Sequence, residues 1–158
     1  MPNVQTSYGS NMPAGIAGAQ ADMVPSTVVS RTVETAAGIG FGKVVRQGVA
    51  DKGIILDLDT VDMDAFSFVG ITLVDRGVGN PVAADADKYP QYSSARVMTK
   101  GTVWVEVAGA VVAGTDVTVT LASGVLGSAA VGAGVVAIPN ARWETSTAGA
   151  GLAIVRLQ

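Results

Sequence analysis

RVMTKGTVWVEVAGAVVAGTDVTVTL, from Arg96 to Leu121, is the most strongly patterned stretch of the chain. Valines alternate with polar or aromatic residues over 102–107, which is the period of two expected for a strand with one buried face. The alternation returns over 115–121. Gly101 and Gly114 precede the two runs, so we expect glycine to supply a positive φ where each begins. The stretch therefore predicts two strands, joined through a glycine-bounded turn, at the centre of a β-core.

Composition favours one all-β domain. The chain has 158 residues, and 49% of them are apolar, mostly Val and Ala, with 20 glycines. Val and Thr suit sheets, whereas frequent Gly interrupts helices. We expect a single compact jelly-roll-like barrel or sandwich of short antiparallel strands over residues 25–158, preceded by an extended N-terminal arm over 1–24. The further strands are expected at 27–33, 43–50, 53–58, 66–75, 135–138 and 151–157.

Missing residue types exclude several classes of function. The chain has no Cys and no His, which excludes disulfides, Ser-His-Asp hydrolysis and HExxH zinc sites. We therefore expect neither an enzyme nor a bound cofactor. The net charge is −3 and no basic cluster is present, so a nucleic-acid partner is not expected.

Membrane association is not expected either. No basic residue precedes Arg31, so the start of the sequence does not resemble a signal peptide. The stretch 117–141 carries no charge, but its Gly, Ser, Thr, Pro and Asn residues suit a lipid-facing helix poorly.

Residues 1–23 are rich in Gly, Ala, Asn, Ser and Gln and offer few bulky side chains. Such a segment cannot bury enough apolar area by itself to offset its ordering entropy, of about 1–2 kcal/mol per residue. Two interpretations remain open: a frayed terminus, or an arm that becomes ordered against a neighbouring subunit through Tyr8, Met12 and Ile16.

Three polar or glycine-rich segments suggest chemistry only weakly. The cluster Asp57, Asp59, Asp62 and Asp64 offers oxygen ligands for calcium, but the EF-hand pattern fails, and a solvated acidic loop is the preferred interpretation. Asp85 and Asp87 lie in a loop-like region, 76–92, where surface charge is more common than an acid/base pair. The glycine-rich stretch 122–134 lacks the following helix that a phosphate-binding loop needs, so we interpret it as turn sequence.

Three blocks of the sequence together resemble a known family. They are NVQTSYGSNMPAGIAGAQADM at residues 3–23, TKGTVWVEV at 99–107 and AIPNARWETSTAGAGLAIVRL at 137–157. They resemble the structural cement, or capsid decoration, proteins of tailed double-stranded DNA bacteriophages. The resemblance implies a virion protein on the outer capsid surface. It would bridge neighbouring major capsid protein subunits as a homo-oligomer, dimer or trimer, and stabilise the shell against the pressure of packaged DNA.

The family carries no catalytic residues to transfer. The residues we expect at an interface are Tyr8, Asn11, Met12, Ile16, Trp104 and Trp143. An alternative function is a surface-displayed carbohydrate-binding β-sandwich, in which Trp104 or Trp143 would stack on a sugar and the Asp57–Asp64 cluster would hold calcium. Calcium-dependent binding would favour this alternative, whereas saturating attachment to capsids would favour the cement protein.

Overall fold

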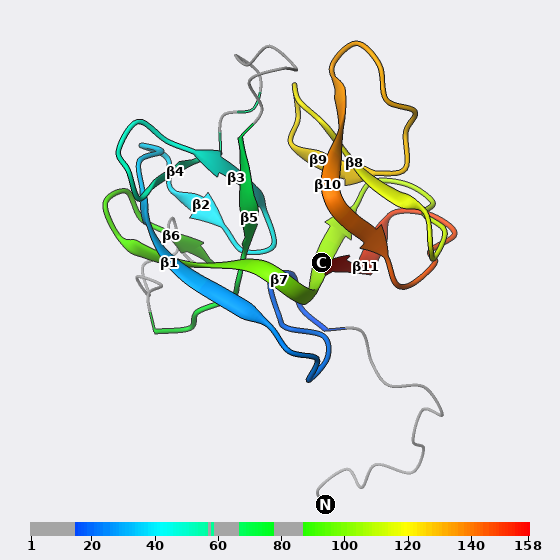
Figure 1. The fold of residues 1–158 in the computed structure, drawn as a ribbon, viewed down its shortest axis with the longest axis horizontal. Helices are drawn as coiled ribbons and strands as arrows, with labels where there is room; N and C mark the ends of the chain where they lie inside the picture. Colours follow the sequence, from blue (N-terminus) through cyan, green and yellow to red (C-terminus); the bar gives the residue numbers. More distant parts are fainter. Residues whose placement is uncertain (1–14, 57, 59–66, 78–86) are drawn as a thin grey trace, which may run out of the picture.

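The computed structural model describes residues 15–56, 58, 67–77 and 87–158. Within these residues the fold is all-β, which confirms the predicted class (Figure 1). The strands are β1 (Thr27–Val33), β2 (Ile39–Gly40), β3 (Val44–Gln47), β4 (Gly53–Ile55), β5 (Phe68–Thr72), β6 (Lys88–Tyr89), β7 (Ser94–Val107), β8 (Asp116–Thr120), β9 (Val125–Gly127), β10 (Val135–Trp143) and β11 (Gly151–Leu157).

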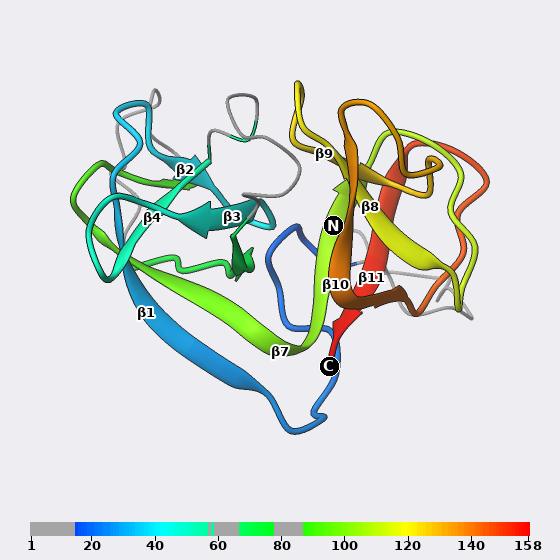
Figure 2. The same ribbon diagram turned by 45° about the horizontal axis from the view of Figure 1, so that its top comes forward.

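The main sheet closes into two rings that share one strand. Its order is β1-β4-β3-β5-β7-β11-β10-β8-β9, and β7 pairs in addition with β1 and with β9. The first extra pairing closes barrel 1, formed by β1, β4, β3, β5 and the first half of β7. The second closes barrel 2, formed by the second half of β7, β11, β10, β8 and β9. Figures 1 and 2 show β7 running from one barrel into the other.

Strand β7 changes the direction of its side chains where it passes between the barrels. Thr27 faces Lys100 and Val28 faces Met98, so Thr99 is an extra residue on β7 and forms a β-bulge. One extra residue reverses the alternation of faces along a strand. Gly101 follows with a φ of 128°, in the range that favours glycine. Ala95 and Val97, before the bulge, can thus line barrel 1, whereas Val103 and Val105, after it, line barrel 2.

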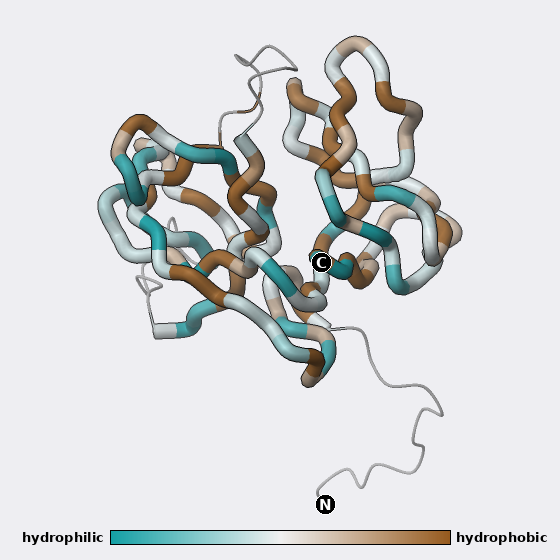
Figure 3. Tube along the Cα trace, in the orientation of Figure 1, coloured by the Kyte–Doolittle hydropathy of each residue, from teal (hydrophilic) through white to brown (hydrophobic). Residues whose placement is uncertain are grey.

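Each barrel has its own core. Core 1, inside barrel 1, contains Val33, Ile39, Val45, Ile54, Tyr89, Ala95 and Val97. Core 2 contains the inward-facing residues of barrel 2, among them Val103, Val105 and Trp143. Val44, Ile71 and Met98 lie side by side on β3, β5 and β7 and belong to core 2 as well. These three strands therefore form a wall between the cores, and Figure 3 shows apolar segments in both barrels.

The structure corrects several expectations about individual strands. The two central strands, β7 and β8, do not pair with each other, because β11 and β10 lie between them. Gly101 lies inside β7 rather than at its start, although Gly101 and Gly114 both have the expected positive φ. Strand β9 lies within the stretch interpreted as turns, and β10 continues five residues beyond its predicted end at Ile138.

Gly70 lies where β5 approaches β7 too closely for a side chain. An added Cβ would fall against the Met98 carbonyl oxygen and 2.7 Å from Cγ1 of Val97. A glycine inside a strand often marks such a close approach, and the pairing of β3 with β5 shifts register beside Gly70.

Replacement of Gly101 by Ala tests the change of face in β7. An Ala would be strained at this φ, and its Cβ would lie 2.8 Å from Cβ of Ser26. We expect Gly101→Ala to lower the free energy of unfolding by about 1–3 kcal/mol in denaturant titrations. The matched control is Gly127→Ala in β9, where an added Cβ meets no atom within 4 Å. Equal stability of the two variants would contradict this role of Gly101.

Candidate interaction surfaces

The described residues show no metal centre. They contain no group of three or more His, Cys, Asp or Glu side chains that could hold a metal ion. Asp57, Asp59, Asp62, Asp64 and Asp85 lie outside the described residues, so the calcium hypothesis stays a prediction there. Likewise, no helix in the described ranges has the length and apolarity needed to cross a membrane.

Trp143 is a core residue. Its side chain is only 1% exposed, and its Nε1 donates a hydrogen bond of 3.3 Å to the Gly127 carbonyl oxygen. The indole therefore offers no surface to a protein partner or to a sugar ring. The expectation that Trp143 lies at an interface is wrong, because the alternation in β10 turns this residue into core 2.

Trp104 lies under the chain's own N-terminal segment, residues 15–22. Its carbonyl oxygen accepts a hydrogen bond of 2.8 Å from Gly18, and its amide donates one of 2.9 Å to Ala19. Gly15 lies so close that an added Cβ would be 2.6 Å from the indole Nε1. The half-buried ring therefore packs against its own chain, so neither tryptophan named in the carbohydrate hypothesis is an open platform for a sugar.

The N-terminal segment also joins the two barrels. The Ala21 amide bonds to the Thr102 carbonyl on β7, and the Val74 amide, just after β5, bonds to the Gly18 carbonyl at 2.8 Å. Gly18 has a φ of 82°, and an added Cβ would lie 2.8 Å from the Val74 nitrogen. Ile16 is 47% exposed and remains available to a partner, whereas Tyr8, Asn11 and Met12 lie outside the described residues.

An apolar groove of about 780 Å³ lies between the barrels. Leu56 lines it from barrel 1, and Leu126 and Leu152 line it from barrel 2. Lys43 and Glu106 form an ion pair across it, with Nζ 3.2 Å from Oε2. Because both side chains are substantially exposed, this pair contributes little to stability.

Glu34, the residue after β1, is hydrogen-bonded to residues of two turns of barrel 1. Its carboxylate accepts hydrogen bonds of 2.8 Å from the amides of Val49 and Ala50. Its carbonyl oxygen accepts one of 3.1 Å from Nε2 of Gln91. We call this region, the turns 48–52 and 90–93 with Glu34 between them, the Glu34 tip.

The two backbone amides that bond to the carboxylate lower the pKa of Glu34 below its usual value of 4.5. Each hydrogen bond favours the charged form of the carboxyl group, and the slight burial, which acts in the opposite direction, is the smaller effect. The charged carboxylate thus stabilises the turn 48–52 through hydrogen bonds and is not a reactive group.

Two bulky apolar side chains of the Glu34 tip are exposed. Val49 is 98% exposed and Tyr92 is 76% exposed. Sequence reasoning missed both, because a single Val in a turn and a single Tyr in a loop carry no periodic signal. Only the tertiary structure shows that their turns meet at the end of β1, where the Val49 amide bonds to the Glu34 carboxylate and the Tyr92 amide bonds to the Val33 carbonyl.

Comparison with known proteins gives a matching family and solved structures of similar fold. The model of the family described as "Structural cement protein (E217 gp24/Pam3 gp6)" matches residues 4–158. A chain of the solved structure titled "The capsid of Myoviridae Phage XM1" is similar to this one with a TM-score of 0.71 and 18% sequence identity. The match covers 100% of this chain and 98% of that chain. A search of the curated proteins gives no match.

Replacement of Gly18 by Val tests the attachment of the N-terminal segment. The new side chain would collide with the Val74 and Gly42 backbones, so we expect residues 15–22 to leave β7. The Trp104 amide should then exchange with solvent much faster, while the Trp143 amide, bonded to the Thr115 carbonyl in barrel 2, stays protected. Gly149→Val is the control, because an added Cβ there meets no atom within 4 Å. Unchanged exchange at Trp104 would contradict the expectation.

The pKa of Glu34 predicts a loss of stability in acid. Because this pKa is lower in the folded than in the unfolded chain, the stabilisation is complete above about pH 4.5 and is lost as the pH falls through the folded value. Glu34→Gln should therefore be less stable than the wild type at neutral pH. The difference in free energy of unfolding between the wild type and Glu34→Gln should become smaller below pH 4.5. A difference that stays constant down to pH 3 would refute this account.

Proposed function

Because the chain belongs to the phage structural cement protein family, we propose that it binds the outer surface of an assembled capsid and bridges neighbouring major capsid protein subunits. The observation that carries the proposal is the extent of the family match, residues 4–158, which includes both barrels. A chain with the same fold in a solved phage capsid supports it. A structural role in the capsid is the part that these comparisons already support.

The architecture suits a clamp better than a catalyst. The two barrels are joined by a continuous strand, a shared wall and the N-terminal segment, so the body can transmit force between contacts at different places on its surface. Its described residues contain no group of three or more His, Cys, Asp or Glu side chains that could hold a metal ion, and the chain lacks His and Cys. We therefore propose a non-enzymatic protein that stabilises the shell against packaged DNA.

Self-association is part of the proposal. Each contact with the lattice is expected to be weak, because the exposed apolar residues are few and scattered. Several weak contacts joined in a homo-oligomer, dimer or trimer, act at high effective concentration on a repeating lattice. Residues 1–14, with Tyr8, Asn11 and Met12, are proposed to add a contact of this kind, together with the exposed Ile16.

The test is attachment to capsids assembled without the chain. Purified protein should bind them saturably, co-sediment with them in a density gradient and raise the temperature at which the particles release DNA. Binding should be unchanged by a calcium chelator. Absence of saturable binding, or binding that requires calcium and is displaced by sugars, would overturn the proposal.

Deletion of residues 2–14 refines the same experiment. The deletion spares residues 15–22, which bond to β7, so the truncated body should remain folded. We expect weaker retention on particles and, in light scattering, a smaller average mass if the arm contacts a neighbouring copy. Full retention together with an unchanged mass would show that residues 2–14 are not part of the interface.

A further inference from the structure

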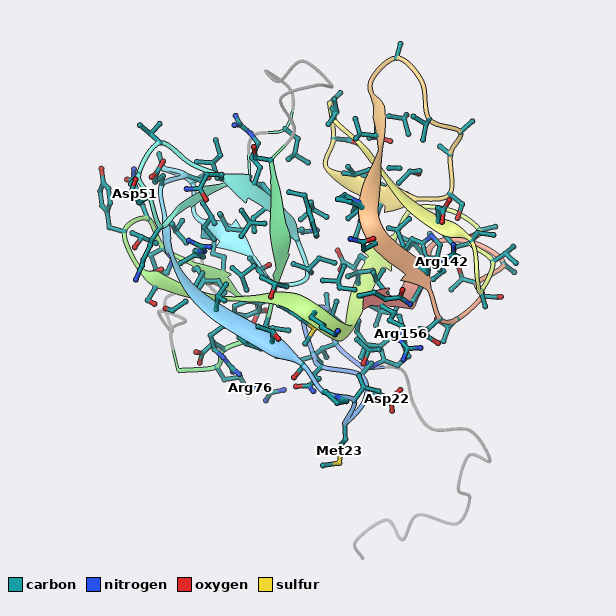
Figure 4. All side chains as sticks on the ribbon, in the orientation of Figure 1. Asp22, Met23, Asp51, Arg76, Arg142 and Arg156 are labelled. Atoms are coloured by element: carbon teal, nitrogen blue, oxygen red, sulfur yellow. The ribbon has the colours of Figure 1, made fainter. Side chains whose placement is uncertain are left out.

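We propose that the Glu34 tip is a second capsid contact, in which Tyr92 and Val49 enter an apolar pocket on a capsid protein and Glu34 positions them. The inference rests on the proposed function and adds a specific surface to it. The tip lies away from the N-terminal segment: Figure 4 places Asp51, of the first turn, at the opposite end of the molecule from Arg142 on β10 and far from Met23. A bridging protein needs contacts at separated places, and the tip supplies one.

Val49 and Tyr92 are among eight bulky apolar side chains that are exposed in the described ranges, and Met23 is the most exposed of the eight. Most bulky apolar residues in the described ranges belong to the two cores, whereas Val49 and Tyr92 extend almost fully into solvent. Exposed apolar side chains on two neighbouring turns can enter a concave apolar surface on another protein. Tyr is also among the residues that most often dominate protein interfaces.

The backbone holds Tyr92 in a costly conformation. Its φ is 64°, in the left-handed region that bulky residues rarely adopt, and it is one of three non-glycine residues with positive φ in the described part of the chain. The Tyr92 amide bonds to the Val33 carbonyl at 2.7 Å, and Ser93 bonds back to the Pro90 carbonyl at 2.6 Å through its hydroxyl. Glycine or Asn would fit this backbone with less strain, so stability alone does not explain a Tyr here.

Hydrogen bonds also hold the turn that carries Val49 in one conformation before any partner binds. Besides the two bonds from its amides to Glu34, the Gln47 side chain donates to the carbonyls of Ala50 and Asp51 at 2.7 and 3.2 Å. Gly53 closes the turn with a bond of 2.9 Å to the Ala50 carbonyl. A fixed turn loses little conformational entropy when it binds, which favours its use as a contact.

The charges of the tip indicate what kind of partner it fits. The exposed Asp51 and Lys52 are adjacent and of opposite sign, and the Glu34 carboxylate bonds to backbone amides. The Arg31 guanidinium, which bonds to the Asp51 carbonyl at 3.4 Å, balances the Glu34 charge. The tip therefore presents no strong field of either sign. This favours an apolar pocket with a neutral polar rim on a protein, and not a nucleic acid or a charged membrane surface.

Full-length variants, bound to capsids assembled without the chain, test the proposal. Tyr92→Asn removes the ring but suits the left-handed backbone, so its melting temperature should equal or exceed that of the wild type. Its apparent affinity should fall by about tenfold or more. Val49→Ser should weaken binding in the same direction, and Tyr92→Phe should bind like the wild type. The control is Val131→Ser in barrel 2, which removes a side chain that is 58% exposed and should leave binding unchanged.

The positioning role of Glu34 needs a readout beyond loss of binding. Glu34→Gln should speed hydrogen exchange at the Val49 and Ala50 amides and weaken attachment. In a chain that already carries Val49→Ser and Tyr92→Asn, Glu34→Gln should weaken attachment no further, because the groups that it positions are gone. An additional loss in that background would show that Glu34 acts on binding by another route and would overturn this part of the proposal.

The outcomes separate this inference from the proposed function. If the wild type binds capsids and the Tyr92 and Val49 variants bind equally well, the tip is not a contact but the proposed function stands. If the variants lower the oligomer mass in light scattering while each protomer still attaches normally, the partner is a second copy of the chain and the capsid assignment is overturned. Equal losses for Val131→Ser and the tip variants would also overturn it. If the wild type does not bind capsids, both the tip contact and the proposed function are wrong.

Discussion

The structure depends on one strand that belongs to two closed barrels. A β-strand directs alternate side chains to opposite faces, so residues six apart lie on the same face. A regular β7 could therefore not direct Val97 into core 1 and Val103 into core 2. The bulge at Thr99 supplies the extra residue that reverses the faces, and Gly101 supplies the backbone conformation that follows it. Both rings close on this strand, so the positions of the other main-sheet strands follow from its change of face.

The two barrels form one body because they share more than β7. Strands β3 and β5 direct Val45 and Val69 toward core 1 and Val44 and Ile71 toward core 2, so the same wall stabilises both cores. The N-terminal segment adds hydrogen bonds to β7 and to Val74, two residues after β5. We expect such a body to resist relative movement of its two halves, as the proposed clamping of a capsid would require.

The polar network around Glu34 shows how a surface feature can be specified without a pocket. One carboxylate and one carbonyl oxygen fix two turns that are far apart in sequence, and the turns in turn display Val49 and Tyr92. The exposed apolar side chains and the strained φ of Tyr92 bring no evident benefit to the isolated chain. Their common position at one end of barrel 1 is what connects them to the proposed role in bridging.

The sequence alone determined the all-β class, the bounds of β1 and β11 and the family, because alternation, glycine placement and extended blocks of similarity are local properties of the chain. Only the tertiary structure decided which strands pair, since β7 and β8 look like neighbours in sequence but are separated by β11 and β10. The tertiary structure also decided the exposure of the two tryptophans, both of which the sequence analysis had placed at the surface. Trp143 enters core 2 and Trp104 is covered by residues 15–22, and both outcomes follow from contacts with segments distant along the chain. The Glu34 tip could not be predicted from the sequence for the same reason. Hydrogen bonds between residues 34, 49 and 91 produce no periodic pattern in a sequence.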